Sequence, residues 1–506
     1  MIADLHSHPT RRVYESDSLH TPVQEPDVKP ALKSEDAQIH FAFLSPAEKG
    51  FFQGVQGGTL TQSTMQQFCE CLARRDNTQI KKWITDHALA SSRSGINKFD
   101  WLNALSDQIS QPAVDYVKCG QYDYFEELKR QYRLFRVAER EGNCSLAVPG
   151  ENLSTTHNDL TKVVLAINGI HSLGIGNPED ECMQDGQPRL DISLGRLKSR
   201  IHQIKGEEPL DDPYLSRWEH PPMMVRLAHH FGNGIFGHAR SLPENAKMLF
   251  DQTRNLNKGI IKVSGYEIVR ELLGLDEALR PTGSRRILID MLHLSAASRN
   301  NLYEQVYRIY NKNINPTQPI PVIFTGAAYS GIDYLIEMIR NGEDGREGDD
   351  QRVNGYYGGS INLSDEDVLA VFWSNGLIAL TLEECRLGDE MGGIEKVFSN
   401  SPRRKAMRLL SRQIAGIISI PFAYHLAAPL NIWNCLSIGP GLGNRTSLVA
   451  HYRNQPDLKI LQQDVEEVLF KLKRDEPMWF GGFKPSQLAE KICSENVREF
   501  TALNFR

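Results

Sequence analysis

Short apolar runs of strand length recur along this chain from about residue 161 onward, separated by longer segments with helical periodicity, such as 265–273 and 365–373. A strand made almost wholly of apolar residues must be buried on both faces, which is the condition of a parallel sheet covered by helices. Alternation of such strands with helices predicts an α/β fold built on a parallel sheet. The strand candidates in this part of the chain are 163–167, 223–227, 287–289, 321–324, 377–380 and 435–438.

A seventh strand candidate opens the chain at residues 2–8 and ends in His6-Ser7-His8. Seven candidates approach the eight strands of a closed (β/α)8 TIM barrel, and a chain of 506 residues is within the size of barrels that carry insertions. A doubly wound open sheet is the structural alternative. No Gly-x-Gly-x-x-Gly motif follows any of the strands, which disfavours a dinucleotide-binding version of that sheet.

The segment between the first strand and the later ones has a different pattern of residues. It begins with a polar, proline-containing stretch over 9–35 and continues with helical periodicity from about 60 to 140. We therefore expect 1–8 to be the first barrel strand and 9–150 to be a loop plus a largely helical insertion. Residues 151–506 are expected to form the remainder of the barrel with C-terminal helices.

Composition narrows the classes of function. The formal charge of −6 is mild and the basic residues are scattered, which argues against a nucleic-acid partner. No run of about 18 apolar residues and no apolar leader are present, which argues against a membrane span or a secretory signal. The eight cysteines are dispersed without a Cys-x-x-Cys pair, which favours a reduced, cytoplasmic protein. A small molecule is the expected partner, and association into homo-oligomers is left open.

Two histidines at the end of the first strand suggest a metal site. Residues two apart on a strand point to the same face, so the imidazoles of His6 and His8 can reach one ion. Imidazole is a common ligand of zinc, which needs further donors from elsewhere in the fold. The alternative is a polar strand end that carries two solvated histidines.

Other polar residues follow the later strands. Asn168 and His171 follow the run at 163–167, His229 and His230 follow the next one, and His293 follows the one after. A barrel gathers the C-terminal ends of its strands into one mouth, so these side chains are expected to converge. Because neighbouring strand residues face opposite ways, at most one of His229 and His230 is expected to enter a shared site.

Several short motifs, taken in order and spacing, carry a resemblance to a known family; they lie at 4–9, 167–173, 227–229, 288–295, 321–326, 362–365 and 438–441. In these motifs the chain resembles the membrane (renal-type) dipeptidase family of the amidohydrolase superfamily, as a divergent member. The resemblance implies a (β/α)8 barrel of the metal-dependent hydrolase type, with two metal ions bridged by a carboxylate. It also implies that a metal-bound hydroxide attacks the carbonyl of a dipeptide.

Four positions correspond to functional residues of that family. His6 matches the metal histidine of the first strand, and His8 stands where the family usually has an aspartate. His293 matches a histidine ligand of the second metal ion. His229 matches the histidine that touches the substrate. The resemblance thus implies His6, His8 and His293 as metal ligands.

Three positions depart from the family. Asn168 replaces the bridging glutamate, Gly326 replaces a second-metal histidine, and Gly441 replaces an aspartate that acts in proton transfer. Two divalent cations about 3.5–4 Å apart repel each other unless an anion bridges them. We therefore expect one zinc ion rather than two, with a metal-free barrel as the alternative.

The expected function is hydrolysis of an amide or peptide bond in a dipeptide-like small molecule. His229, Asn168 and His171 are the expected substrate-binding residues, and Asp290 and Glu383 are the candidate bases. The alternative is a metal-free barrel that is catalytically inactive or repurposed, and that acts as a binding or interaction protein.

Overall fold

The computed structural model describes residues 2–7, 37–46, 123–151, 153, 160–174, 183–184, 187–188, 191–241, 252–261, 263–346, 352–388, 401–439, 451–452 and 459–506. Its main feature is a sheet of eight parallel strands, each hydrogen-bonded to the next in chain order. These strands are β1 (Ile2–Ser7), β2 (Ala37–Leu44), β4 (Lys162–Ile167), β7 (Met224–Arg226), β8 (Leu288–Asp290), β9 (Ile323–Ala327), β12 (Leu377–Leu380) and β13 (Leu436–Ile438).

The strand order identifies an α/β barrel. All eight strands are parallel and follow one another in sequence order, and the two end strands, β1 and β13, approach each other. A doubly wound sheet reverses its strand order at a switch point, so that alternative is wrong. The expected (β/α)8 class is confirmed, and all seven strand candidates from the sequence lie in this sheet. A ninth short strand, β3 (Ser145–Leu146), pairs with β4 beside this path.

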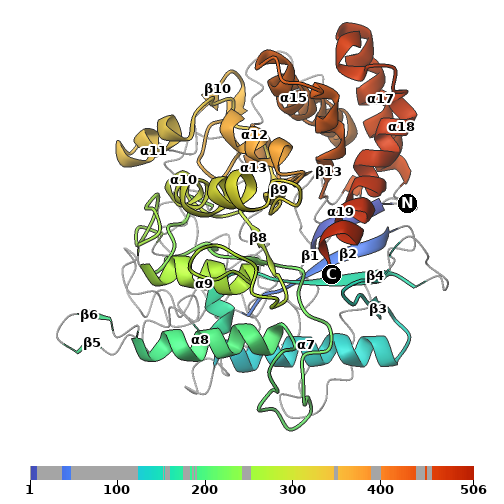
Figure 1. Ribbon diagram of the computed structural model, residues 1–506. Coiled ribbons are helices and arrows are strands. Elements are labelled where there is room, and N and C mark those ends of the chain that lie inside the picture. Colours follow the sequence, from blue (N-terminus) through green and yellow to red (C-terminus); the bar gives the residue numbers. More distant parts are fainter. Residues whose placement is uncertain are drawn as a thin grey trace, which may run out of the picture.

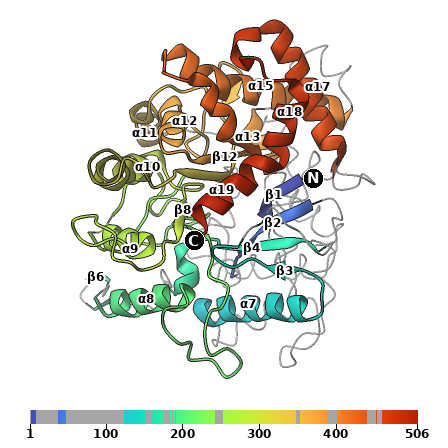
Figure 2. The same ribbon diagram turned by 45° about the vertical axis from the view of Figure 1, so that its right-hand side comes forward.

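Helices follow the strands and cover the outside of the sheet (Figures 1 and 2). They are α7 (Tyr124–Arg140), α8 (Asp191–Ile204), α9 (Val263–Leu273), α10 (Ala296–Leu302), α11 (Leu335–Glu343), α12 (Asp365–Trp373), α13 (Glu384–Leu387), α15 (Pro402–Ala423), α17 (Lys459–Asp475), α18 (Pro485–Glu490) and α19 (Asn496–Asn504). Within the described part of the chain, none of the helices has both the length and the apolar character that crossing a membrane requires.

Strand residues alternate between two apolar clusters. One cluster lies inside the barrel and holds Phe41 and Phe43 of β2 together with Ala166 of β4 and Leu288 of β8. The larger cluster lies between the sheet and the helices and takes the residues that point the other way, such as Leu165. This alternation is what strand geometry demands when both faces are buried.

The end of the described chain closes one end of the barrel interior. Val497 and Phe500 of α19, with Phe505, pack into the interior cluster beside Ala3 and Ile39, near the N-terminal ends of β1 and β2. The side chains at the opposite, C-terminal ends of the strands therefore belong to the mouth where barrels of this kind carry their sites.

One strand was missed by the sequence analysis. β2 (Ala37–Leu44) lies within 9–150, the segment expected to be a loop plus insertion, yet it joins β1 to β4 in the sheet. Gln38 and His40 interrupt its apolar run, and the polar stretch before it hid the strand. The signal was present in the period-two spacing of Ile39, Phe41 and Phe43, which now line the interior.

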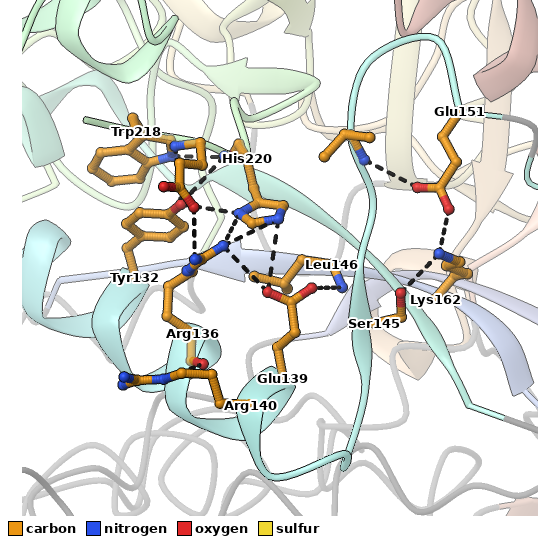
Figure 3. A network of polar contacts seen from close by, with 12 residues as sticks. Tyr132, Arg136, Glu139, Arg140, Ser145, Leu146, Glu151, Lys162, Trp218 and His220 are labelled. Carbon is orange, nitrogen blue, oxygen red and sulfur yellow. Dashed lines mark hydrogen bonds and ion pairs between the residues drawn. The ribbon is translucent and has the colours of Figure 1, made fainter. Parts of the chain in front are cut away.

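Helix α7 packs against the segment that leads into β7. Its Tyr132 stacks on Trp218 with ring centroids 4.3 Å apart, and the Tyr132 hydroxyl lies 3.0 Å from Nδ1 of His220 (Figure 3). Arg136 pairs with Glu219 at 2.6 Å. Trp218, Glu219 and His220 immediately precede β7, so this network fastens α7 to the N-terminal edge of the sheet.

Candidate functional site

Four imidazoles gather at the mouth of the barrel. The ring centroids of His229 and His293 lie 4.9 Å apart, and those of His230 and His293 lie 5.0 Å apart. His171, in the short helix η3 (Ile170–Leu173) after β4, has its ring 6.2 Å from that of His229. The structure therefore brings together the side chains that follow β4, β7 and β8.

His229 and His230 both take part in this cluster, so the expectation that at most one would enter it is wrong. The reason is that β7 ends at Arg226, and both histidines lie in the loop that follows. Their rings are only 3.8 Å apart, and both lie close to His293. The opposite-face rule applies to strand backbone and does not extend to this loop.

Three of the expected site positions lie wholly or in part outside the described residues. His8 and Gly441 lie outside the described residues, and so does the side chain of His6. The backbone of β1 is described, and its Ser7 is paired with Ala42 of β2, which in turn is paired with Leu165 of β4. The end of β1 is thus close to the level at which β4 ends.

A fully buried arginine occupies the centre of the barrel below the histidine cluster. Arg226 is the last residue of β7 and lies 3.9 Å from the ring centroid of Phe43, while its Nη2 donates to the Thr325 hydroxyl at 2.7 Å. Phe43 is two strands away on one side of β7, and Thr325 is two strands away on the other. A side chain that reaches both must cross the barrel interior.

Asp290 is the anionic partner of this arginine. Nε of Arg226 donates to Oδ2 of Asp290 at 2.8 Å, and neither side chain is exposed to solvent. Burial lowers the pKa of the Arg226 guanidinium, and the Asp290 charge opposes that effect. An arginine remains protonated under such conditions, so the pair is a buried ion pair.

The remaining lone pairs of Asp290 are also engaged. Its Oδ1 accepts from the backbone N–H groups of Thr325 at 3.0 Å and Leu292 at 3.1 Å, and its Oδ2 accepts from the Thr325 hydroxyl. A general base needs a lone pair directed at the proton that it removes. The contacts of Asp290 therefore favour a structural role, in which it holds the strand ends in position, over the role of general base that the sequence suggested.

Asn168 connects the arginine to the histidines. Its Oδ1 accepts from Nη1 of Arg226 at 3.1 Å, and its Nδ2 lies 2.9 Å from Nε2 of His229 and 3.1 Å from Oγ of Ser45. The amide is therefore satisfied at its oxygen and at both hydrogens. A guanidinium, an amide and an imidazole form a continuous chain from the barrel interior to the mouth.

Glu383, the other candidate base, lies beyond the end of β12 and is paired with Arg386. Nε of Arg386 is 2.8 Å from Oε2 of Glu383, and its Nη1 donates to the Gly326 carbonyl oxygen at 3.0 Å. Gly326 has a φ of +96°, a backbone conformation that favours glycine over histidine. A second guanidinium thus contacts the position where the resemblance would place a metal-binding histidine.

These contacts do not fit a second metal ion. The amide oxygen of Asn168 accepts from Arg226, and its N–H groups face His229 and Ser45, so this side chain supplies no negative charge to bridge two cations. Within the described ranges, no group of three or more His, Cys, Asp or Glu side chains is arranged to hold a metal ion. The described part of the site also holds two guanidinium groups, which repel a cation.

His171 is a buried imidazole with one open nitrogen. The ring is hydrogen-bonded to the Pro46 carbonyl, and its Nε2 has no hydrogen-bond partner among the described residues. Burial lowers the pKa of His171 to about 4, against the smaller opposing effect of the Pro46 contact. His171 is therefore a neutral imidazole at ordinary pH and presents an acceptor nitrogen.

The low pKa of His171 predicts a dependence of stability on pH. Between pH 6.5 and about 4 the unfolded chain binds a proton at this residue that the folded chain does not, so stability falls as the pH is lowered. We expect the free energy of unfolding of the wild type to fall by roughly 3 kcal/mol more than that of His171→Gln between pH 7 and pH 4. Urea unfolding at several pH values measures this difference.

The control for this experiment is His425→Asn, because His425 is exposed and its left-handed backbone conformation suits asparagine. That variant should follow the wild-type pH curve. Parallel curves for the wild type and His171→Gln would contradict the assignment of a lowered pKa to His171.

Two functional candidates were missed by the sequence analysis, Arg226 and Arg386. Arg226 had a clear signal, since it is the one charged residue inside the apolar run 223–227. A charge in a strand that is buried on both faces must find a partner in the interior. Arg386 follows Glu383 by three residues, the spacing of a helical ion pair.

Comparison with known proteins found similarity only to solved structures, and at low sequence identity. No protein-family model matches the sequence, and no curated protein sequence matches it. Among solved structures, similar chains include the probable dipeptidase PvdM from Pseudomonas aeruginosa, with 12% identity, a TM-score of 0.39, and coverage of 78% of this chain and 81% of that one. An amidohydrolase from Pseudomonas aeruginosa has 11% identity and a TM-score of 0.40, covering 76% and 85%.

A metallopeptidase from Rhodobacter sphaeroides, liganded with a phosphinate mimic of the dipeptide L-Ala-D-Ala, has 11% identity and a TM-score of 0.44, covering 100% of this chain and 98% of that one. The barrel assignment given above does not depend on these likenesses. It follows from the order, direction and pairing of the eight strands.

Proposed function

We propose that this protein is a hydrolase that acts on an amide or peptide bond of a small, dipeptide-like molecule at the mouth of its barrel, with no more than one metal ion. The observation that carries the proposal is the cluster formed by His171, His229, His230 and His293 at the C-terminal ends of parallel strands. Imidazoles bind metal ions, exchange protons near neutral pH and hydrogen-bond to carbonyl groups. Three separate strands bring these groups to the part of the barrel where such chemistry occurs.

The single ion would be held by His6 and His8, with His293 as a further donor. The support for this is that residues two apart on a strand point to the same face, so two imidazoles with this spacing can share one ion. A zinc ion held there would supply Lewis acidity for the hydrolysis. His293 has a φ of +69°, an uncommon backbone conformation outside glycine, which turns its ring toward His229 and His230.

The other residues of the mouth would bind and orient the substrate. His229 and Asn168 are joined by their 2.9 Å contact, so they act as one unit at the inner wall of the mouth. His171 offers its open Nε2 as an acceptor for a donor group of the ligand. Glu383, paired with Arg386 and only partly exposed, is the proposed base.

Metal analysis of the protein purified without a histidine tag tests this proposal. We expect about one zinc ion per chain in the wild type and a near-complete loss in His6→Ala. A screen of dipeptides and N-acyl amino acids should then reveal turnover in the wild type that the variant lacks. The control is His425→Ala, which changes an exposed histidine and should keep both metal and activity.

Two ions per chain would contradict the single-ion proposal directly. A metal-free wild type without turnover would favour the second candidate function, a barrel that binds a small molecule without hydrolysing it. The observation that favours this candidate is the internal charge balance at the mouth. Arg226 is paired with Asp290 and Arg386 with Glu383, so the arginines do not leave an excess of positive charge to activate a substrate carbonyl.

A further inference from the structure

We infer that Arg226 is a positioning residue which, through Asn168, fixes His229 as a neutral imidazole with its proton on Nδ1. The inference rests on the proposed function only in that His229 is taken to meet the substrate. The hydrogen-bonding argument itself follows from the two contacts that link Arg226 to Asn168 and Asn168 to His229.

The first contact sets the direction of the amide. A guanidinium only donates hydrogen bonds, so the atom of Asn168 that lies 3.1 Å from Nη1 of Arg226 must be the amide oxygen. Turning the amide over would place N–H groups of Asn168 against N–H groups of Arg226. Because both side chains are fully buried, water cannot relieve that repulsion.

The second contact sets the tautomer of the histidine. With its oxygen on Arg226, Asn168 presents N–H to both Ser45 and His229. Nε2 of His229 lies 2.9 Å from that N–H and must accept, so it carries no proton. The single proton of the ring is then on Nδ1, and any hydrogen bond that His229 donates leaves from Nδ1.

The position of the guanidinium gives the arrangement its rigidity. Arg226 is bonded at the same time to Asn168 after β4, to Asp290 in β8 and to Thr325 in β9. These groups come from three strands other than its own, so the guanidinium ties the ends of four strands together. The amide of Asn168 cannot rotate without breaking its contact to a guanidinium that Asp290 and Thr325 also hold.

The tautomer can be measured directly by nitrogen-15 NMR on protein labelled at histidine, with the His229 signal assigned by its loss in His229→Gln. In the wild type, Nε2 of His229 should show the shift of a bare nitrogen and Nδ1 that of a protonated one. In Asn168→Asp the carboxylate can only accept, so Nε2 should become protonated and its shift should move accordingly. A wild type with a protonated Nε2, or a variant with an unchanged signal, would overturn the inference.

Arg226→Lys tests the arginine itself, because lysine keeps the charge and loses the planar fork that holds several partners at once. We expect His229 to lose its single tautomer and to give signals of both forms. The matched control is Arg386→Lys, which changes the other guanidinium of the mouth and should leave the His229 signal unchanged. An unchanged signal in Arg226→Lys would show that Arg226 does not position the imidazole.

If Arg226→Lys does not fold, the wild-type tautomer and Asn168→Asp still decide the question. The readout also separates this inference from the proposed function. The expected tautomer in a protein without turnover would leave the inference standing and remove the hydrolase. A protonated Nε2 of His229 in an active enzyme would overturn the inference and leave the hydrolase proposal standing.

Discussion

Replacing Arg226 by methionine is expected to lower the free energy of unfolding by about 3–5 kcal/mol, because the change leaves Asp290 as an uncompensated charge in the barrel interior. The two side chains are 2.8 Å apart and neither is exposed. Methionine fills much of the arginine volume, so the loss is electrostatic rather than a cavity effect. Urea unfolding followed by circular dichroism measures the change.

The double variant Arg226→Met with Asp290→Asn separates the charge from the packing. Asparagine removes the isolated carboxylate and keeps an oxygen for the backbone N–H groups of Leu292 and Thr325. The double variant should be more stable than Arg226→Met alone, with a coupling between the two positions of about 0.5–3 kcal/mol. The surface control is Arg308→Met, whose exposed pair with Glu304 should contribute no more than about 1 kcal/mol.

Replacing Arg299 by methionine is expected to have a comparable effect, a loss of about 3–5 kcal/mol in the free energy of unfolding. Arg299 in α10 is fully buried and lies 3.0 Å from Oδ2 of Asp367 in α12. It also donates to the backbone carbonyls of Leu294, Ser360 and Asn362. Its removal leaves one buried carboxylate and several carbonyl groups without their donor.

Arg299→Lys is the informative companion variant. Lysine keeps a positive charge for Asp367 but has three donors on one atom, and it cannot span the carbonyls that the planar guanidinium reaches. We expect it to recover only part of the stability that Arg299→Met loses. Full recovery would mean that the carbonyl contacts contribute little and that charge alone matters here. Thermal and urea unfolding of the three proteins decide between these outcomes.

The sequence predicted much of the fold because its physical signal is local. Strands buried on both faces must be nearly continuous in apolar residues, so 163–167 and 377–380 could be placed within a residue of β4 and β12. β2 was missed because His40 and Gln38 break the run, and burial of a polar strand residue depends on neighbours that a local pattern does not contain. Helix α7 falls within the stretch of helical periodicity, but its packing could not be predicted, since its partners Trp218 and His220 are distant in sequence.

The site was less predictable, because its chemistry arises from contacts between distant residues. The positions of Asn168, His229 and His293 could be anticipated from strand ends that meet at one mouth. Their hydrogen bonding could not, because the role of Asn168 is set by Arg226, and that pairing joins residues on different strands. The sequence places an asparagine at position 168, and only the structure shows that a guanidinium is bonded to its amide.

The packing of α19 and Phe505 against Ala3 and Ile39 has a consequence for how the chain folds. The interior of the barrel is completed by contacts between the two ends of the described chain, which are separated by all of the intervening strands. Such contacts carry the highest loop-closure entropy and form late. During synthesis, the apolar residues of the early strands stay uncovered at this end until residues 496–505 emerge. Until that point they are exposed to aggregation or chaperone binding.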